Sequence, residues 1–145
     1  MSKSIDSKRA PEPVGAYPHA RRAGNLLFLS GVGPRQRGSK VIPGVTLDAN
    51  GTVIGYDIEA QCRSCFDNIR SVVEDAGSRW GNIIDVLAFL TDMPRDFDVY
   101  NRVYAEYFAG KGNPNPARTT IEISRLPQGG NAPIAVELKV IATID

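Results

Sequence analysis

Two stretches of the chain place apolar residues at intervals of three and four, which is the spacing of one face of an α-helix. The first begins behind Asp57, a helix-capping residue type, and ends at Gly77, which suits the left-handed backbone found after a helix. The second begins at Asp92, has Pro94 near its first turn and ends within residues 110–115. The two apolar stripes consist of Ile58, Cys62, Cys65, Phe66, Ile69, Val72, Val73 and Ala76, and of Phe97, Tyr100, Tyr104, Tyr107 and Phe108.

Strand patterns flank both predicted helices. Near the start of the chain, residues 16–17 and 25–30 indicate two short strands around a turn at residues 23–25. Between the helices, residues 83–91 are almost continuously apolar, as in a central strand that is buried on both faces. At the end of the chain, residues 117–124 and 134–144 each alternate between two faces, as strands do.

The order of these elements, ββ(β)αβαββ, predicts an α+β fold in which two helices cover one face of a mixed sheet of about six strands. We expect a single domain over residues 1–145, in which the polar, proline-marked residues 1–13 are a partly mobile lead-in. Residues 31–55 form a long loop with a short strand near residues 51–56, and loops of this length rarely lack a function. The second face of the sheet has no helix to cover it, so we expect it to be buried in a closed homo-oligomer.

Composition narrows the range of partners. The formal charge of +1 does not provide the basic surface that nucleic-acid-binding proteins usually carry. The N-terminus is polar and lacks the apolar centre of a signal peptide, and no apolar run is long enough to span a membrane. We therefore expect a cytoplasmic protein that binds a small molecule, with neither nucleic acid nor a membrane as its partner.

The only cysteines are Cys62 and Cys65, and their C-x-x-C spacing has two interpretations. This spacing occurs in redox motifs and in half of a zinc site. However, the chain has no second cysteine pair, and His19, its only histidine, lies far away in the sequence. Both cysteines lie on the apolar stripe of the first predicted helix, which favours packing in the core. We therefore expect no metal and no other cofactor.

The last third of the chain holds the strongest candidates for chemistry. Arg118 opens a strand on which Thr120 and Glu122 share its face, and Glu137 lies midway along the final strand among apolar residues. A guanidinium can hold a carboxylate through two parallel hydrogen bonds. A carboxylate in an apolar strand is rare unless it is paired or functional. If the two strands lie together, they set a cation beside a carboxylate, which suits a small organic anion and a water molecule.

Both candidates also have a structural interpretation. Arg118 can pair with Glu122 on the same face of its strand, and Glu137 can pair with a neighbouring basic side chain. The glycine-rich residues 31–38 follow a strand but lead into another loop, whereas a phosphate-binding loop requires a helix directly after it. The basic residues of this loop are either solvated or the receptor for a second anionic group.

Several short motifs resemble those of a known family. They are Gly15-Ala-Tyr17, Leu29-Ser-Gly31, Asn101-x-x-Tyr104, Pro116-Ala-Arg118 and the strand Glu137–Ala142. In this order, over residues 10–144, they are similar to the RidA/YjgF family of enamine and imine deaminases. Within that family, the loop at residues 34–56 and the opening residues 10–19 are most similar to the 2-aminomuconate deaminases of bacterial aromatic degradation.

The resemblance implies a chorismate-mutase-like fold, a homotrimer and active sites in the clefts between subunits. It implies that Arg118 binds the substrate carboxylate and that Glu137 positions the attacking water. It also implies a pocket lined by Tyr17, Ser30, Gly31, Asn101 and Thr120. Many relatives have a cysteine where this chain has Thr120, so a thiol is not required here.

The resulting hypothesis is the hydrolysis of 2-aminomuconate, in its imine form, to 4-oxalocrotonate and ammonia. Arg118 then binds the C1 carboxylate and Glu137 orients water toward C2. The remote carboxylate requires a cation of its own, for which the candidates are Arg35, Arg37, Lys40 and Arg95.

Two alternatives remain open at this point. One is a general deaminase that clears small reactive 2-imino acids of the 2-aminoacrylate type. The other is a non-catalytic oligomeric binding protein, including the RNA-directed activity attributed to relatives, which the near-neutral charge disfavours.

Overall fold

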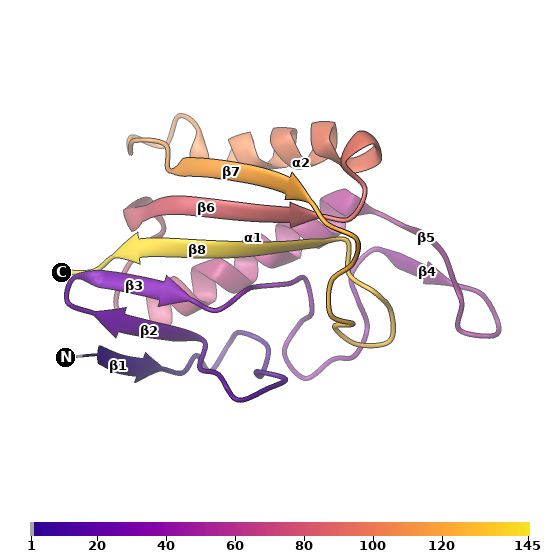
Figure 1. The fold of residues 1–145 in the computed structure, drawn as a ribbon, viewed down its shortest axis with the longest axis horizontal. Coiled ribbons are helices and arrows are strands. Elements are labelled where there is room, and N and C mark those ends of the chain that lie inside the picture. The colour runs from indigo at the N-terminus through magenta and orange to yellow at the C-terminus, as the bar shows by residue number, and fades with distance from the viewer. Residues whose placement is uncertain (1) are drawn as a thin grey trace.

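The computed structural model describes residues 2–145, which form one mixed sheet, two helices and a separate hairpin (Figure 1). The sheet has six strands in the order β1-β2-β3-β8-β6-β7. All neighbouring strands are antiparallel except β6 and β7, which run parallel. The strands are Ser2–Ile5 (β1), Ala20–Ala23 (β2), Leu26–Leu29 (β3), Ile83–Leu90 (β6), Ala117–Glu122 (β7) and Val136–Thr143 (β8).

Helices α1 (Ile58–Asp75) and α2 (Met93–Phe108) cover the same face of this sheet, and in Figure 1 α1 lies behind it while α2 runs along its upper edge beside β7. Asp57 caps α1 because its side chain accepts hydrogen bonds from two backbone N–H groups of the first turn, and Asp92 caps α2 in the same way with one. Gly77 follows α1 with a φ of 88°, the left-handed conformation that the sequence predicted. A short 3-10 helix over Trp80–Asn82 leads into β6. The predicted α+β fold with two helices on one face is confirmed.

The main core lies between the helices and the sheet. Alternate residues of β8 point into it and are buried, and the stripe of α1 packs against them. Cys62 and Cys65 are fully buried, and both are free thiols that form no disulfide. Burial raises the pKa of the Cys62 thiol to about 12, so both side chains are inert apolar groups, as their position on the stripe predicted.

Three segments differ from the sequence-based prediction. Residues 2–5, expected within a mobile lead-in, form β1 and pair with β2 at the edge of the sheet. The strand expected at residues 16–17 lies instead at Ala20–Ala23, although the turn that follows it was placed correctly. The loop over residues 31–55 contains a hairpin of two strands, β4 (Val45–Leu47) and β5 (Val53–Tyr56), of which only the second was predicted.

Helix α1 also carries buried polar side chains that fix the segments at one end of the sheet. The Gln61 side-chain oxygen accepts a hydrogen bond from the Ala135 N–H at 2.9 Å, just before β8 begins. The Asn68 amide donates to the carbonyl groups of Gly33 and Arg35 at 3.0 and 2.7 Å. These bonds position the loop after β3 and the start of β8, the two segments from which the candidate site is built.

Replacement of Asn68 by alanine is expected to lower the free energy of unfolding by about 1–3 kcal/mol, because two carbonyl groups lose their donor in a poorly hydrated place. The matched control is Asn115→Ala, at an exposed position outside the helices and strands. Urea denaturation measures both variants. Equal effects at the two positions would show that Asn68 does not hold the loop.

Candidate functional site

A cavity of about 130 Å³ lies between the segment that precedes β2 and the loop that follows β3. Four of the predicted site residues line it, namely Tyr17, Ser30, Gly31 and Glu137. The rest of the wall comes from residues 10–14, residues 32–35, residues 127–129, His19, Val72 and Ile134. Segments far apart in the sequence therefore meet at one end of the sheet.

The carboxyl group of Glu137 packs directly against the backbone of Gly31. A Cβ atom built on Gly31 would lie 2.7 Å from the Glu137 Oε2 atom and 3.0 Å from its Cδ atom. Only glycine leaves room for the carboxyl group in this place. Burial raises the pKa of the Glu137 carboxyl above its usual value, which brings it closer to the range in which a carboxylate exchanges protons at neutral pH.

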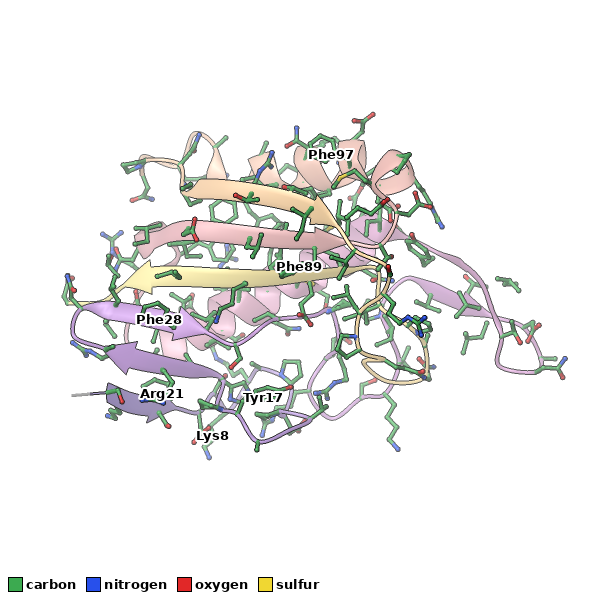
Figure 2. All side chains as sticks on the ribbon, in the orientation of Figure 1. Lys8, Tyr17, Arg21, Phe28, Phe89 and Phe97 are labelled. Carbon is green, nitrogen blue, oxygen red and sulfur yellow. The ribbon has the colours of Figure 1, made fainter. Side chains whose placement is uncertain are left out.

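Tyr17 and Ser30 hold the segment that borders the cavity. The Tyr17 hydroxyl accepts a hydrogen bond from the Val14 N–H at 3.2 Å, and the Ser30 hydroxyl donates to the Pro18 carbonyl at 2.7 Å. Figure 2 shows Tyr17 in this segment, beyond the right-hand ends of β1 and β2. Tyr17 thus supplies an aromatic wall, whereas the Ser30 hydroxyl already uses its proton to shape the segment.

His19 also lines the cavity, and the sequence did not mark it as a site residue. Its Nδ1 atom accepts a hydrogen bond from the Ser7 N–H at 3.0 Å, so Nε2 carries the proton and donates to the Pro11 carbonyl at 2.7 Å. Both ring nitrogens are therefore engaged with the segment before β2. No local sequence pattern predicts that His19 holds this segment, because its two hydrogen-bond partners, Ser7 and Pro11, lie at no regular spacing from it.

Arg118, Asn101 and Thr120 do not join this cavity. Arg118 is in register with Val86 of β6, which is buried beneath the helices, whereas Glu137 is in register with Phe89, three residues further along the same strand. Because side chains alternate along a strand, positions three residues apart point to opposite faces. The expected juxtaposition of Arg118 and Glu137 is therefore wrong within one chain, and β6 also separates their two strands.

The surroundings of Arg118 form a second polar cluster, on the helix side of the sheet. Its Nη1 atom donates to the Asn101 side-chain oxygen at 2.8 Å, and its guanidinium lies 4.6 Å from the centre of the Tyr104 ring. The hydroxyl groups of Tyr100, Tyr104 and Thr120 are buried and have no hydrogen-bond partner within residues 2–145. Burial raises the pKa of both tyrosines, so their hydroxyls remain donors. A guanidinium beside free donors suits the binding of a carboxylate.

Glu122 does not pair with Arg118, although the two share a face. Its Oε1 atom instead accepts a hydrogen bond from the Met93 N–H at 2.9 Å, at the N-terminus of α2. The carboxylate is favourably placed there because a helix N-terminus carries partial positive charge. Arg118 is therefore not neutralised by Glu122.

The four candidate residues for binding a second carboxylate differ in their positions relative to the cavity. Arg35 lines the cavity. Arg37 donates to the Ala10 carbonyl at 2.7 Å from outside it, and Lys40 is exposed on the loop. The Arg95 guanidinium lies 3.8 Å from the centre of the Tyr56 ring, and Arg95 does not line the cavity. Of the four, Arg35 has the position from which it can meet a ligand held by the cavity.

Two further properties bear on the kind of site. Within residues 2–145, no group of three or more histidine, cysteine, aspartate or glutamate side chains is arranged to hold a metal ion. None of the helices in the same range is both long and apolar enough to cross a membrane.

The fold and the two polar clusters define the class of protein. A six-stranded mixed sheet, two helices on one face and a cavity in which a glutamate packs on a glycine form a small α+β domain. Over residues 7–144, the sequence matches the family described as Endoribonuclease L-PSP. The chain belongs to this family, which includes the RidA/YjgF proteins.

Relatives in the family have informative names. A 2-iminobutanoate/2-iminopropanoate deaminase of Escherichia coli is 30% identical over 142 residues, with 98% of each chain covered. A RutC family protein of Pyrococcus horikoshii is 37% identical, again with 98% of each chain covered. The structure of E. coli TdcF with bound serine has a TM-score of 0.81 and 29% identity, with 99% of each chain covered. A Rid family protein from Yersinia pestis has a TM-score of 0.78 and 33% identity, with 99% of this chain and 100% of that chain covered.

The burial of Glu137 predicts a pH-dependent effect on stability. Because burial raises the pKa of Glu137 in the folded state, the folded protein binds more protons than the unfolded chain between the two pKa values. Its stability therefore falls as the pH rises through this interval. Glu137→Gln is expected to raise the midpoint of thermal unfolding at about pH 7.5, and to raise it less at about pH 4.

The control for this measurement is Asp98→Asn, which removes an exposed carboxylate of α2. It is expected to change the midpoint little at either pH. A Glu137→Gln variant that is no more stable than the original protein at the higher pH would show that the carboxylate is not held in a poorly hydrated place.

Proposed function

We propose that this protein is a 2-imino acid deaminase whose active site forms between two copies of the chain. The observation that carries the proposal is the Glu137 carboxyl group, which packs on Gly31 at the wall of a cavity and has a raised pKa. The similarity to a named imine deaminase supports the reaction, and the serine bound to TdcF supports a small carboxylate ligand.

The need for two copies follows from the split of the polar groups across the sheet. Glu137 lies on the face that the helices leave open, and Arg118 lies on the other face, so one chain holds two incomplete halves. The open face also carries apolar side chains, of which Phe28 and Ile121 are 36% and 38% exposed. Figure 2 shows Phe28 and Phe89 on the strands of this face. A second chain that covers it can bring its own Arg118 cluster to the cavity, and a closed trimer repeats this contact three times.

The proposed reaction needs orientation and one proton relay. The Arg118 guanidinium of one copy holds the substrate carboxylate. The Glu137 carboxylate of the other copy accepts a proton from a water molecule while the oxygen of that water bonds to C2 of the imine. Glu137 passes this proton to the imine nitrogen, which gives a carbinolamine. Glu137 then takes the proton of the carbinolamine hydroxyl and passes it to the nitrogen, the C–N bond breaks as the C=O bond forms, and ammonia leaves a 2-oxo acid behind. Orientation of the reactants can reduce such a barrier by about 7–11 kcal/mol.

Two substrate classes fit this mechanism. The comparisons favour a general deaminase of small 2-imino acids, because the named relative acts on 2-iminobutanoate and 2-iminopropanoate. A single observation favours 2-aminomuconate as the second candidate, with 4-oxalocrotonate as its product. This observation is the position of Arg35, a further cation at the cavity wall. A purely binding role is disfavoured by the raised pKa of Glu137, since a binding site for an anion gains nothing from a buried carboxylate.

Subunit mixing tests the shared site. Arg118→Ala and Glu137→Gln are each expected to reduce kcat/KM for freshly generated 2-iminopropanoate by about a hundredfold or more. When equal amounts of the two variants are unfolded and refolded together, about a quarter of the sites receive an intact Arg118 and an intact Glu137. We therefore expect about a quarter of the original activity to return.

Each variant taken through the same procedure alone is the control and is expected to remain inactive. If both residues acted within one chain, no mixture would contain an intact site, so a mixture without activity would contradict the shared site. Turnover at the original rate by either single variant would contradict the proposed function itself.

The contact between Gly31 and Glu137 gives a second test. Gly31→Ala is expected to displace the carboxyl group, because the added methyl group would lie 2.7 Å from its oxygen, and to lower kcat by about tenfold or more. Gly55→Ala is the matched control, since a Cβ atom there meets no atom within 4 Å. Steady-state kinetics and thermal unfolding are measured for both. Unchanged kcat in a folded Gly31→Ala variant would show that the position of Glu137 does not matter.

A further inference from the structure

We propose that Tyr100 is a positioning residue for Arg118, and that its hydroxyl group forms hydrogen bonds only when Arg118 holds a carboxylate. Thr120 is the partner of this hydroxyl. The inference rests on the proposed function, because it adds a residue to the half of the site that binds the substrate carboxylate. Tyr100 acts through Arg118 and not on the ligand itself, since its side chain is fully buried.

The hydroxyl group of Tyr100 is not explained by packing. Tyr100 belongs to the buried stripe of α2 and is the largest fully buried side chain within residues 2–145. Its ring centre lies 6.3 Å from that of Phe97 and 5.8 Å from that of Tyr104. A phenylalanine at this position would make the same ring contacts, whereas a buried hydroxyl without a partner lowers stability. Its presence therefore indicates a role outside the packing of the core.

The Tyr100 hydroxyl lies beside the side chains of Thr120 and Arg118. Burial raises the pKa of Tyr100, and interactions with these two side chains oppose part of that rise. Both lie on the helix side of β7, because their partners in β6 are buried residues. The hydroxyl oxygens of Tyr100 and Thr120 are buried, and neither has a hydrogen-bond partner within residues 2–145. Two hydroxyl groups with unused donors and acceptors therefore adjoin the guanidinium.

Arg118 itself is held loosely in the free chain. The Arg118 residue is exposed, and its Nη1 atom donates to the Asn101 side-chain oxygen at 2.8 Å. Its guanidinium also lies over the rings of Tyr104 and Tyr100, at 4.6 and 5.6 Å from their centres. A guanidinium with one such hydrogen bond and two flat supports keeps the freedom to turn in its own plane. A carboxylate bound through two parallel hydrogen bonds removes this freedom.

A bound carboxylate therefore allows the two hydroxyl groups to form hydrogen bonds. Once the guanidinium is fixed, the Tyr100 oxygen accepts a hydrogen bond from Arg118, and the Tyr100 O–H donates to the Thr120 oxygen. The charge of the guanidinium strengthens a chain of this kind. The free protein thus carries the cost of unpaired hydroxyl groups, and their pairing adds to the affinity for a carboxylate.

Tyr100→Phe tests this role, because it keeps the ring and removes the hydroxyl. Without ligand, the variant is expected to unfold about 2–4 °C higher than the original protein, since it loses an unpaired buried group. Isothermal titration calorimetry on the full-length protein is expected to show pyruvate, the 2-oxo product of 2-iminopropanoate hydrolysis, binding about fivefold more weakly. A residue that only supports the fold would lower the stability instead.

Steady-state kinetics give a further measurement with the same variant. The KM for 2-iminopropanoate is expected to rise by about fivefold, while kcat changes by less than about twofold, because the proton relay of Glu137 is untouched. Pyruvamide has nearly the shape of pyruvate but no charge. Its affinity is expected to change by less than about twofold, because it lacks the charge-assisted hydrogen bonds that fix Arg118.

Two more variants identify the partner and control for the substitution. Thr120→Val removes the second hydroxyl at nearly constant volume, and in this background Tyr100→Phe should weaken pyruvate binding by less than about twofold. Tyr107→Phe is the matched control, because it makes the same change in the same helix. The Tyr107 hydroxyl donates to the exposed Asp67 carboxylate at 3.4 Å, so its loss should alter neither the pyruvate affinity nor KM.

A pyruvate affinity that is unchanged in Tyr100→Phe, or a lower unfolding temperature, would overturn the positioning role. An equal loss of affinity with and without the Thr120 hydroxyl would overturn the pairing, and failure of the original protein to bind pyruvate would overturn the whole inference. Pyruvate binding that depends on Tyr100 without any imine turnover would contradict only the deaminase. Imine turnover with a KM that is insensitive to Tyr100→Phe would contradict only the positioning role.

Discussion

The register of β6 against its two neighbours decides where every candidate residue of the site lies. Val86, Ala88 and Leu90 point toward the helices and are buried with the apolar face of β8. A slip of one residue would turn this entire apolar set toward the open face, so the packing of the core fixes the register. The directions of the Arg118 and Glu137 side chains follow from this register, because each residue pairs with one residue of β6 and points to the same face of the sheet as that residue. The division of the polar groups is therefore enforced by the hydrophobic core and not by the site.

The same core restricts how Glu137 can be used. Its neighbours on either side along β8, Val136 and Leu138, point into the core and are fully buried, so the Glu137 side chain points to the open face, where it is half-buried and its carboxyl group is partly desolvated. The raised pKa that results is a cost in stability at neutral pH and an advantage for proton transfer. Gly31 and the buried amides of α1 allow this arrangement, one by leaving space and the others by fixing the surrounding loops. Sites of this kind often trade stability for reactivity.

Much of this fold could be predicted from the sequence, because the helices, the central strand and the last two strands follow strong periodic patterns with clear caps. Strand β1 could not, since Ser2–Ile5 has no apolar alternation and is held by main-chain bonds to β2. For the site, local motifs identified the residue types that the cavity and the Arg118 cluster contain. The distribution of these residues between two faces was not predictable, because register arises from contacts between distant segments. The role of His19 depends likewise on irregular partners, and the choice of Arg35 over the other cations required the path of the loop.

Since neither face of the sheet holds a full set of polar groups, a single folded chain is an incomplete catalyst in the mechanism proposed here. Its activity would be a property of the assembly, and would decline at protein concentrations low enough for the subunits to separate, even while each chain keeps its helices and strands. The amount of protein in the cell would then set the activity of each molecule as well as the number of molecules. A substitution on the open face, remote from any ligand, could silence a site simply by keeping a neighbour away.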